Sequence, residues 1–323
     1  MRTFLIRRLL AAIPLIFFVT FFTKAMLVLS PGNFLDELRM KPNISHEYLE
    51  RMEQKYHLDS RNVFERYWYW LKPALRGDLG DSFITSAPVT TLIGWRVLNT
   101  LMLTGAALIF SWALAIPLGV FAAVYRNRWV DKLCGFVSFF GLSIPSVFFS
   151  LLLILFAART GWFPAGGIHD QVNWDYMNGW QRAMDTLWHL TLPTVVLGTL
   201  AMAQYMRQMR SEMIETLSQD YIRTARAKGL PERRIIFRHA LGNAINPLVT
   251  LFGLSLAYLL AGALLTEYVF AWPGLGTLVY EALRDKDEPL VMAAVTILVI
   301  MLVVGNLAAD LLLAVIDPRI RVE

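Results

Sequence analysis

Residues 221–241 read YIRTARAKGLPERRIIFRHAL and stand between two long apolar runs. The segment Tyr221–Lys228 has the composition of a short helix, and Gly229 follows it where a helix C-terminus favours left-handed backbone geometry. Pro231 suits the first turn of a second helix, and Glu232 complements the positive end of that helix. The stretch therefore predicts a helix, a glycine turn and a second helix.

The predicted second helix has two chemically different sides. Its apolar side carries Ile235, Ile236 and Leu241, and its basic side carries Arg233, Arg234 and Arg238. In the first helix, the small residues Ala225 and Ala227 allow close approach by another molecule. Composition alone leaves two interpretations open: the loop lies on anionic lipid, or it docks into a cleft of a partner protein.

Composition places most of the chain in a membrane. The 323 residues are 56% hydrophobic and 17% charged, whereas soluble domains are about one quarter charged. The apolar residues gather in runs of about 20, which match a hydrocarbon core ~30 Å thick. The net charge of +5 lies mostly in short loops between these runs, so it indicates membrane orientation and not nucleic-acid binding.

Six apolar segments predict an all-α membrane protein with six transmembrane helices. They are Leu9–Ser30, Val97–Val124, Leu133–Ala158, Leu187–Met206, Ala244–Thr266 and Leu290–Ile316. The first run is too long for the core of a cleaved signal peptide, so we expect a retained anchor. The short basic loops 126–132 and 207–243 fall on the same side as the N-terminus, and this pattern predicts that both termini are cytoplasmic.

The pattern divides the chain into three parts. Residues 1–30 form the first transmembrane helix, residues 31–96 form an extracytoplasmic loop with interfacial helices, and residues 97–323 form a five-helix core that contains the cytoplasmic loop 207–243. The aromatic run Tyr67–Trp70 favours the membrane–water interface, so we expect a helix there on the outer leaflet. We find no convincing internal repeat, which argues against an inverted-repeat secondary transporter.

Few polar residues interrupt the apolar segments. Lys24 stands near the outer end of the first, and we expect its amine to reach the lipid headgroups. Asn306 and Asp310 lie four residues apart on one face of the last, which should face protein, either to pack helices or to line a transport path. Prolines that can kink their helices stand at Pro117, Pro145 and Pro193.

Several catalytic classes lack their sequence motifs. There is no G-x-x-x-x-G-K-[ST] phosphate loop, so we do not expect this chain to hydrolyse ATP, and there is no G-x-S-x-G elbow of a serine hydrolase. Residues His46–Glu50 resemble part of a zinc-protease motif, but Glu50 replaces the second histidine. With Cys134 as the single cysteine, we expect no metal site. A membrane enzyme and a stand-alone secondary transporter or channel remain as rival interpretations.

The segment Arg223–Gly229 resembles the EAA loop of permease subunits from binding-protein-dependent ABC importers, in the dipeptide, oligopeptide and nickel branch. Further motifs of this branch are matched, in order, by residues 7–14, 30–32, 76–80 with Ser82, 99–101, 267–276 and 317–320. The resemblance therefore spans nearly the whole chain. It departs at Gly242, where many relatives carry proline, and residues 41–60 fit only loosely.

The resemblance implies a type I ABC importer permease fold in a bacterial inner membrane. In the family, two homologous permease subunits form the pathway, two ATPase subunits bind ATP and Mg beneath them, and an extracytoplasmic binding protein delivers the substrate. This chain would then bind no cofactor of its own, carry no catalytic residue, and contact lipid but no nucleic acid. A peptide is the expected substrate; nickel chelates, glutathione and sugars are the alternatives.

The resemblance also implies roles for particular residues. The ATPase-coupling residues would be Tyr221, Arg223, Thr224, Ala225, Arg226, Ala227, Lys228, Gly229 as the hinge, and Leu230. An outward loop near the binding protein or the pore mouth would include Glu267, Trp272, Pro273 and Gly274. A purely structural turn is an equal alternative for this second group.

Overall fold

The computed structural model describes residues 2–32, 34–39, 46–56, 60 and 62–316. Within these ranges the chain is helical, and its extended backbone pairs only in one isolated bridge between Asp81 and Pro88. The predicted all-α class is therefore confirmed. The chain divides into two compact units, residues 1–99 with 274–303 and residues 100–273 with 304–323.

Four helices of the described residues are long and apolar enough to cross a membrane. They cover Leu10–Leu29, Val89–Val124, Gly179–Leu217 and Glu288–Ala308, and a bent pair of shorter helices brings the number to five if the pair forms one span. A further helix, α12 (Asn246–Val269), lies where the fifth span is predicted. The six-span count, the cytoplasmic termini and the three-part division of the chain stay predictions.

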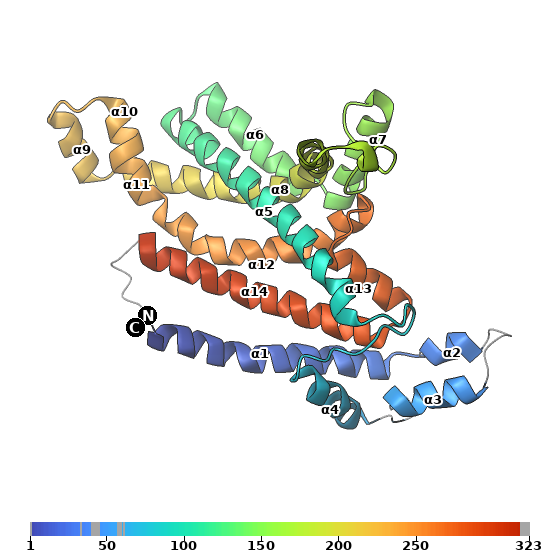
Figure 1. The fold of residues 1–323 in the computed structure, drawn as a ribbon. Helices are drawn as coiled ribbons and strands as arrows, with labels where there is room; N and C mark the ends of the chain where they lie inside the picture. The colour runs from blue at the N-terminus through green and yellow to red at the C-terminus, as the bar shows by residue number, and fades with distance from the viewer. Residues whose placement is uncertain (1, 33, 40–45, 57–59, 61, 317–323) are drawn as a thin grey trace. The chain divides into compact units, whose positions relative to one another are not determined.

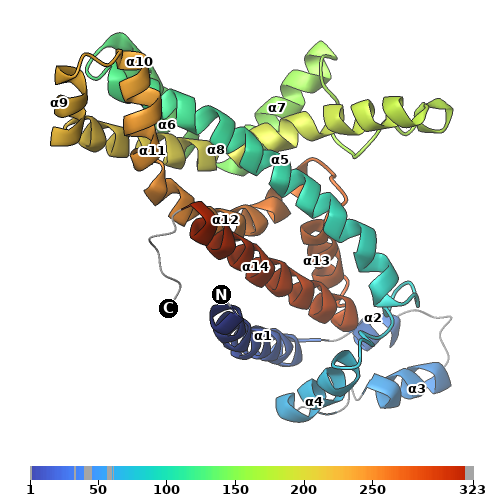
Figure 2. The same cartoon turned by 60° about the vertical axis from the view of Figure 1, so that its left-hand side comes forward.

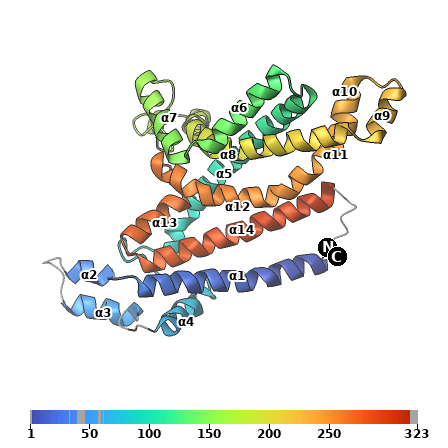
Figure 3. The same cartoon turned by 180° about the vertical axis from the view of Figure 1, so that it is seen from behind.

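The first unit joins segments that are far apart in the sequence. It contains α1 (Arg2–Leu29), α2 (Phe34–Arg39), α3 (His46–Tyr56), α4 (Val63–Ala74), the start of α5 (Val89–Val124), α13 (Leu275–Arg284) and the first part of α14 (Glu288–Ile316) (Figures 1 and 3). Val89 and Ile93 of α5 pack against Leu275 and Leu278 of α13 and against Val291 of α14. α4 lies beside α1, where the hydroxyls of Thr20 and Tyr67 are 2.9 Å apart.

A buried group of charges connects three helices of the first unit. Glu288, at the start of α14, accepts hydrogen bonds from both Lys24 of α1 and Arg66 of α4. Lys24 is only 4% exposed and pairs with Glu288, so the expectation that its side chain extends along the surface towards water is wrong. An opposite charge within the protein compensates the cost of removing the ammonium from water. Beside it, the hydroxyl of Ser82 donates to Asp287 at 2.6 Å.

The second unit is organised around the 39-residue helix α8 (Gly179–Leu217). It also contains the rest of α5, α6 (Trp129–Ser143), α7 (Ser146–Thr160), the 3₁₀ turn η1 (Trp174–Tyr176), the short helices that follow α8, α12 and the end of α14 (Figure 2). α6, α7 and α12 all contact α8. At about 1.5 Å per residue α8 is roughly 58 Å long, well beyond a ~30 Å hydrocarbon core.

The predicted span Leu133–Ala158 is not one continuous helix. It breaks at Ile144 and Pro145, and the two halves, α6 and α7, lie at 104° to one another. Pro145 lacks a backbone N–H and disfavours helical geometry in the residue before it, and Ile144 is accordingly extended (φ −80°, ψ 123°). By contrast, α5 and α8 continue through Pro117 and Pro193.

Small residues bring α5 and α6 close to α8. A Cβ atom on Gly119 of α5 would lie 2.6 Å from Met209 Cβ, and one on Gly198 of α8 would lie 2.6 Å from Phe110 Cδ1. The hydroxyl of Ser111 donates to the Gly198 carbonyl at 2.8 Å. These paired positions show that α5 and α8 run in the same direction. Close glycine contacts of this kind are typical of packed membrane helices.

We expect Gly119→Ala to lower the free energy of unfolding by about 1–3 kcal/mol, because the added methyl group overpacks the contact with Met209. The matched control is Gly105→Ala on the same helix, where a Cβ would meet no atom within 4 Å. Thermal unfolding of the purified chain in detergent measures both. Equal melting temperatures for the two variants would contradict the glycine contact.

Candidate functional site

The segment that carries the sequence motif follows the C-terminus of α8. It comprises α9 (Asp220–Ala227), α10 (Glu232–Arg234), the π-helical turn η2 (Ile235–Ala240) and α11 (Leu241–Ala244), which leads to α12. We name residues 220–244 the coupling motif. Figures 1 and 2 show α9 and α10 as two adjoining helices at one end of α8. Of the nine predicted coupling residues, six lie in α9, and Lys228, Gly229 and Leu230 lie in the turn that follows it.

Gly229 forms the turn between the two helices. Its φ of +75° is left-handed, its N–H donates to the Arg226 carbonyl at 2.9 Å, and the Leu230 N–H donates to the Ala225 carbonyl at 3.3 Å. This pair of hydrogen bonds is the Schellman arrangement that ends helices. The predicted glycine cap is confirmed. Since a Cβ here would meet nothing within 4 Å, glycine is required by the backbone angle and not by space.

α9 presents one side to the protein and the other to solvent. Ile222 is fully buried and Ala225 is 8% exposed, both within the apolar core cluster of the second unit. The outward side chains are those of Tyr221, Arg223, Thr224, Arg226, Ala227 and Lys228, and Leu230 is half-buried. Ala225 therefore allows α9 to approach its own core, whereas Ala227 is a small residue on the open face.

Two polar contacts hold the coupling motif in shape. Arg226 Nε donates to Glu232 Oε1 at 2.7 Å across the glycine turn, and this contact raises the pKa of the Arg226 guanidinium. Both side chains are about half exposed, so the pair contributes less than about 1 kcal/mol. Asn243 Nδ2 donates to the Tyr221 hydroxyl at 2.9 Å, which fixes α9 against α11. The sequence pattern does not reveal this second contact.

The second helix has the two sides that the sequence predicts. Ile235 is fully buried and Ile236 and Leu241 are half-buried, while Arg233, Arg234 and Arg238 are exposed. Two details differ from expectation. Pro231 immediately precedes the first helical residue, and the residues from Ile235 onward form a π turn, a geometry often found at functional sites. Phe237, within this turn, is 51% exposed and adds an apolar group to the basic surface.

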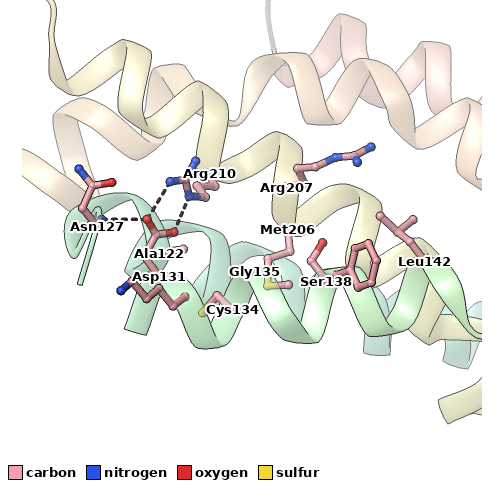
Figure 4. Close-up of a pocket in the computed structure, with 12 residues that line it drawn as sticks. Ala122, Asn127, Asp131, Cys134, Gly135, Ser138, Leu142, Met206, Arg207 and Arg210 are labelled. Carbon is pink, nitrogen blue, oxygen red and sulfur yellow. Dashed lines mark hydrogen bonds and ion pairs between the residues drawn. The ribbon is translucent and has the colours of Figure 1, made fainter. Parts of the chain in front are cut away.

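A bidentate ion pair joins α6 to α8 one to two turns before α8 ends. Arg210 donates from Nε and from Nη2 to Asp131, at 2.6 Å and 2.8 Å. The N–H of Asn127 donates to the same carboxylate at 2.9 Å (Figure 4). A cavity of about 440 Å³ adjoins this pair, and Arg207 points along it away from Asp131. The pair therefore connects the start of α6 to the last part of α8.

The residues predicted for an outer loop have enclosed side chains. Glu267 is fully buried and accepts a hydrogen bond from the Thr100 hydroxyl at 2.6 Å. Trp272 is also fully buried, and its backbone N–H donates to the backbone carbonyl of Glu267 at 2.8 Å. Pro273 is half-buried, and Gly274 precedes the first residue of α13. These side chains support the shape of a turn; a contact with a binding protein stays a prediction.

The polar pair of the last helix is only partly described. Asn306 is half-buried on α14, and the side chain of Asp310 lies outside the described part of the chain. Among the described residues, no group of three or more His, Cys, Asp or Glu side chains is placed to hold a metal ion.

We expect Gly229→Ala to increase amide hydrogen exchange throughout α9, because a left-handed backbone costs an L-residue about 1–2 kcal/mol. Gly229→Asn should disturb α9 less, because asparagine tolerates this geometry. Gly242→Ala is the control, since Gly242 is helical, exposed and without neighbours within 4 Å of an added Cβ. Equal exchange in all three variants would show that the turn does not depend on the φ of Gly229.

Known proteins resemble this chain over almost its whole length. It is 39% identical over 323 residues to the oligopeptide transport system permease protein AppB of Bacillus subtilis (strain 168), covering 99% of this chain and 100% of the relative. It is 33% identical over 324 residues to the glutathione transport system permease protein GsiC of Escherichia coli (strain K12), covering 99% of each chain.

The fold and the family agree with this similarity. An inward-facing structure of the MetNI methionine ABC transporter superposes with a TM-score of 0.55 and 20% identity, covering 71% of this chain and 97% of the other, so the type I permease fold is confirmed. Residues 115–322 match the family described as binding-protein-dependent transport system inner membrane component. The chain therefore belongs to this family, as an inner membrane permease of a binding-protein-dependent ABC importer.

Proposed function

We propose that this permease carries short peptides and that the open face of its coupling motif docks into a groove of a partner ATPase. The substrate class rests on the relatives: one is named for oligopeptides and the other for glutathione, which is itself a tripeptide. The docking role rests on the geometry of α9, which is the observation that carries the proposal.

The open face of α9 is suited to a protein groove. Tyr221, Thr224 and Lys228 stand three and four residues apart, so they form one stripe along the helix. The Tyr221 hydroxyl is held by Asn243, so part of this surface is ordered before a partner arrives. Ala227 leaves room for a close backbone approach. Exposed Arg223 and Lys228 would favour acidic side chains on the partner.

The buried face of α9 would transmit force to the membrane helices. Ile222 and Ile235 belong to the same apolar cluster as Met209 and Met213 of α8 and Leu248 of α12. A displacement of α9 must therefore move these side chains or open a cavity, and close-packed interiors resist cavities. The Asp131–Arg210 pair extends this connection to α6.

In this proposal the energy comes from ATP and Mg bound to two ATPase subunits, while a second permease subunit completes the pathway and an extracytoplasmic binding protein delivers the peptide. This chain supplies no catalytic residue. ATP acts on it only through the difference in affinity of its two conformations for the closed ATPase pair. A stand-alone secondary transporter would leave the open face of α9 without a role.

The test uses the complete transporter in lipid nanodiscs, with its ATPases and peptide-loaded binding protein. We expect Ala227→Trp to reduce co-purification of the ATPase subunits and peptide-stimulated ATP hydrolysis at least tenfold, because the indole obstructs the groove. Ala183→Trp, an exposed alanine near the start of α8, is the matched control and should behave as wild type. Gly229→Trp is less informative because it also strains the turn.

Wild-type assembly and stimulation in the Ala227→Trp variant would refute the docking face. Stimulation by a sugar-loaded or nickel-chelate-loaded binding protein, with none by peptide, would keep the docking face and refute the peptide assignment.

A further inference from the structure

A partly open cavity of about 380 Å³ lies in the first unit, among residues of α1, α3, α4, the loop after α4 and the start of α14. The residues that line it are Lys24, Tyr56, Arg66, Tyr69, Trp70, Pro73, Asp78, Leu79, Gly80, Asp81, Phe83, Glu288 and Pro289. None of them belongs to the coupling motif. Residues 78–80 belong to the sequence motif 76–80, to which the proposed transport function assigns no role.

Charges of opposite sign occupy different parts of this cavity. On the side of α1 and α4, Lys24 and Arg66 share the one carboxylate of Glu288, which leaves an excess of one positive charge. The loop side carries two carboxylates, Asp78 and Asp81. One Asp78 oxygen accepts the Gly80 N–H at 2.9 Å, and the structure gives this carboxylate no cation among the described residues. A molecule with a negative and a positive group complements both sides.

The walls favour an ammonium as the positive group. Tyr69 and Trp70 line the cavity together with Asp78, and aromatic faces beside a carboxylate attract ammonium ions. Arg66 Nε and Trp70 Nε1, from two lining residues of α4, are buried donors without an acceptor among the described residues. A buried donor without an acceptor is unfavourable, so an oxygen-rich anionic group would stabilise this region.

The cavity lies near one end of a candidate membrane span. Lys24 is five residues from the end of the candidate span Leu10–Leu29. Phe64 and Trp68 of α4 and Leu75 at its C-cap are 74%, 58% and 68% exposed, a pattern typical of a helix at the membrane–water interface. In a phospholipid at this interface, the phosphate lies nearer the hydrocarbon core and the amine farther out. Lys24 belongs to the candidate span, whereas Asp78 and Asp81 belong to the loop after α4, outside the candidate spans of the described residues, and this division matches that order.

We propose that this cavity binds the zwitterionic headgroup of a phospholipid with a primary amine, the phosphate towards Arg66 and Lys24 and the ammonium towards Asp78 and Tyr69. The headgroup connects α1, α4 and the start of α14 at the outer membrane surface. A free peptide is also a zwitterion, and the test below separates the two sources.

Asp78→Asn is the sharpest variant, because the asparagine oxygen still accepts the Gly80 N–H while the charge that faces the ammonium is lost. Glu65→Gln, on exposed α4 surface outside the cavity, is its matched control. Trp70→Leu removes an aromatic wall, and Trp68→Leu makes the same change two residues away, outside the cavity.

The full chain is reconstituted in nanodiscs of equal parts phosphatidylethanolamine and phosphatidylglycerol, extracted in mild detergent, and its retained lipids are counted by native mass spectrometry. We expect wild type, Glu65→Gln and Trp68→Leu to retain phosphatidylethanolamine selectively. Asp78→Asn and Trp70→Leu should retain at least fivefold less phosphatidylethanolamine than wild type. Melting temperatures identify any variant that fails to fold. If Trp70→Leu fails to fold, the lipid retention of Asp78→Asn, which keeps the turn, decides whether the proposal holds.

Two results would overturn the proposal. One is equal retention of both lipids by wild type and by Asp78→Asn. The other is that an added dipeptide binds in the cavity when phosphatidylethanolamine is absent, and that Asp78→Asn abolishes this binding. The site would then bind transported peptide. Either result leaves the coupling motif untouched, because no cavity residue belongs to it.

Discussion

Burial of Ile222 and Ile235 in the core of the second unit is the constraint on which the coupling motif depends. Neither side chain retains exposed surface, and both lie in one cluster with the end of α8 and the start of α12. Fully burying an isoleucine contributes about 1.5–3 kcal/mol, far more than the exposed Arg226–Glu232 pair can add. Apolar packing therefore holds α9 in place, and the polar contacts only set its shape.

The same cluster connects the coupling motif to the rest of the unit. α8 contacts α5 and α6 through glycines and hydroxyls, and α6 is tied to α8 again through Asp131 and Arg210. Because these contacts are close, small movements of α9 have few ways to be absorbed locally. A short helix on the outside of the unit can in this way influence several long helices.

Much of this arrangement is predictable from the sequence, for local reasons. Gly229 and Pro231 determine the turn through backbone geometry, and the alternation of isoleucines with arginines determines which side of the second helix is buried. The break at Pro145 could be predicted only as a kink, since its angle of 104° depends on how α6 and α7 pack. The Glu288 ion cluster and the Asn243–Tyr221 contact join residues distant in sequence, which no local pattern reveals.

The same reasoning explains why the surroundings of Ala225 and Lys24 are not predictable from the sequence. Small size in a helix is equally suited to a partner and to the protein's own core, and only the position of the core cluster shows that Ala225 faces inward. A lysine near a span end commonly reaches water, but the carboxylate of Glu288 comes from a helix 264 residues later in the chain.

The central claim is that the buried face of α9 transmits movement while its open face binds the ATPase. Ile222→Ala, measured in the reconstituted transporter as peptides carried per ATP hydrolysed, tests it most directly. The claim predicts that the ATPase subunits still co-purify, because the open face is intact, while peptides carried per ATP fall severalfold. A transport yield equal to wild type would contradict it.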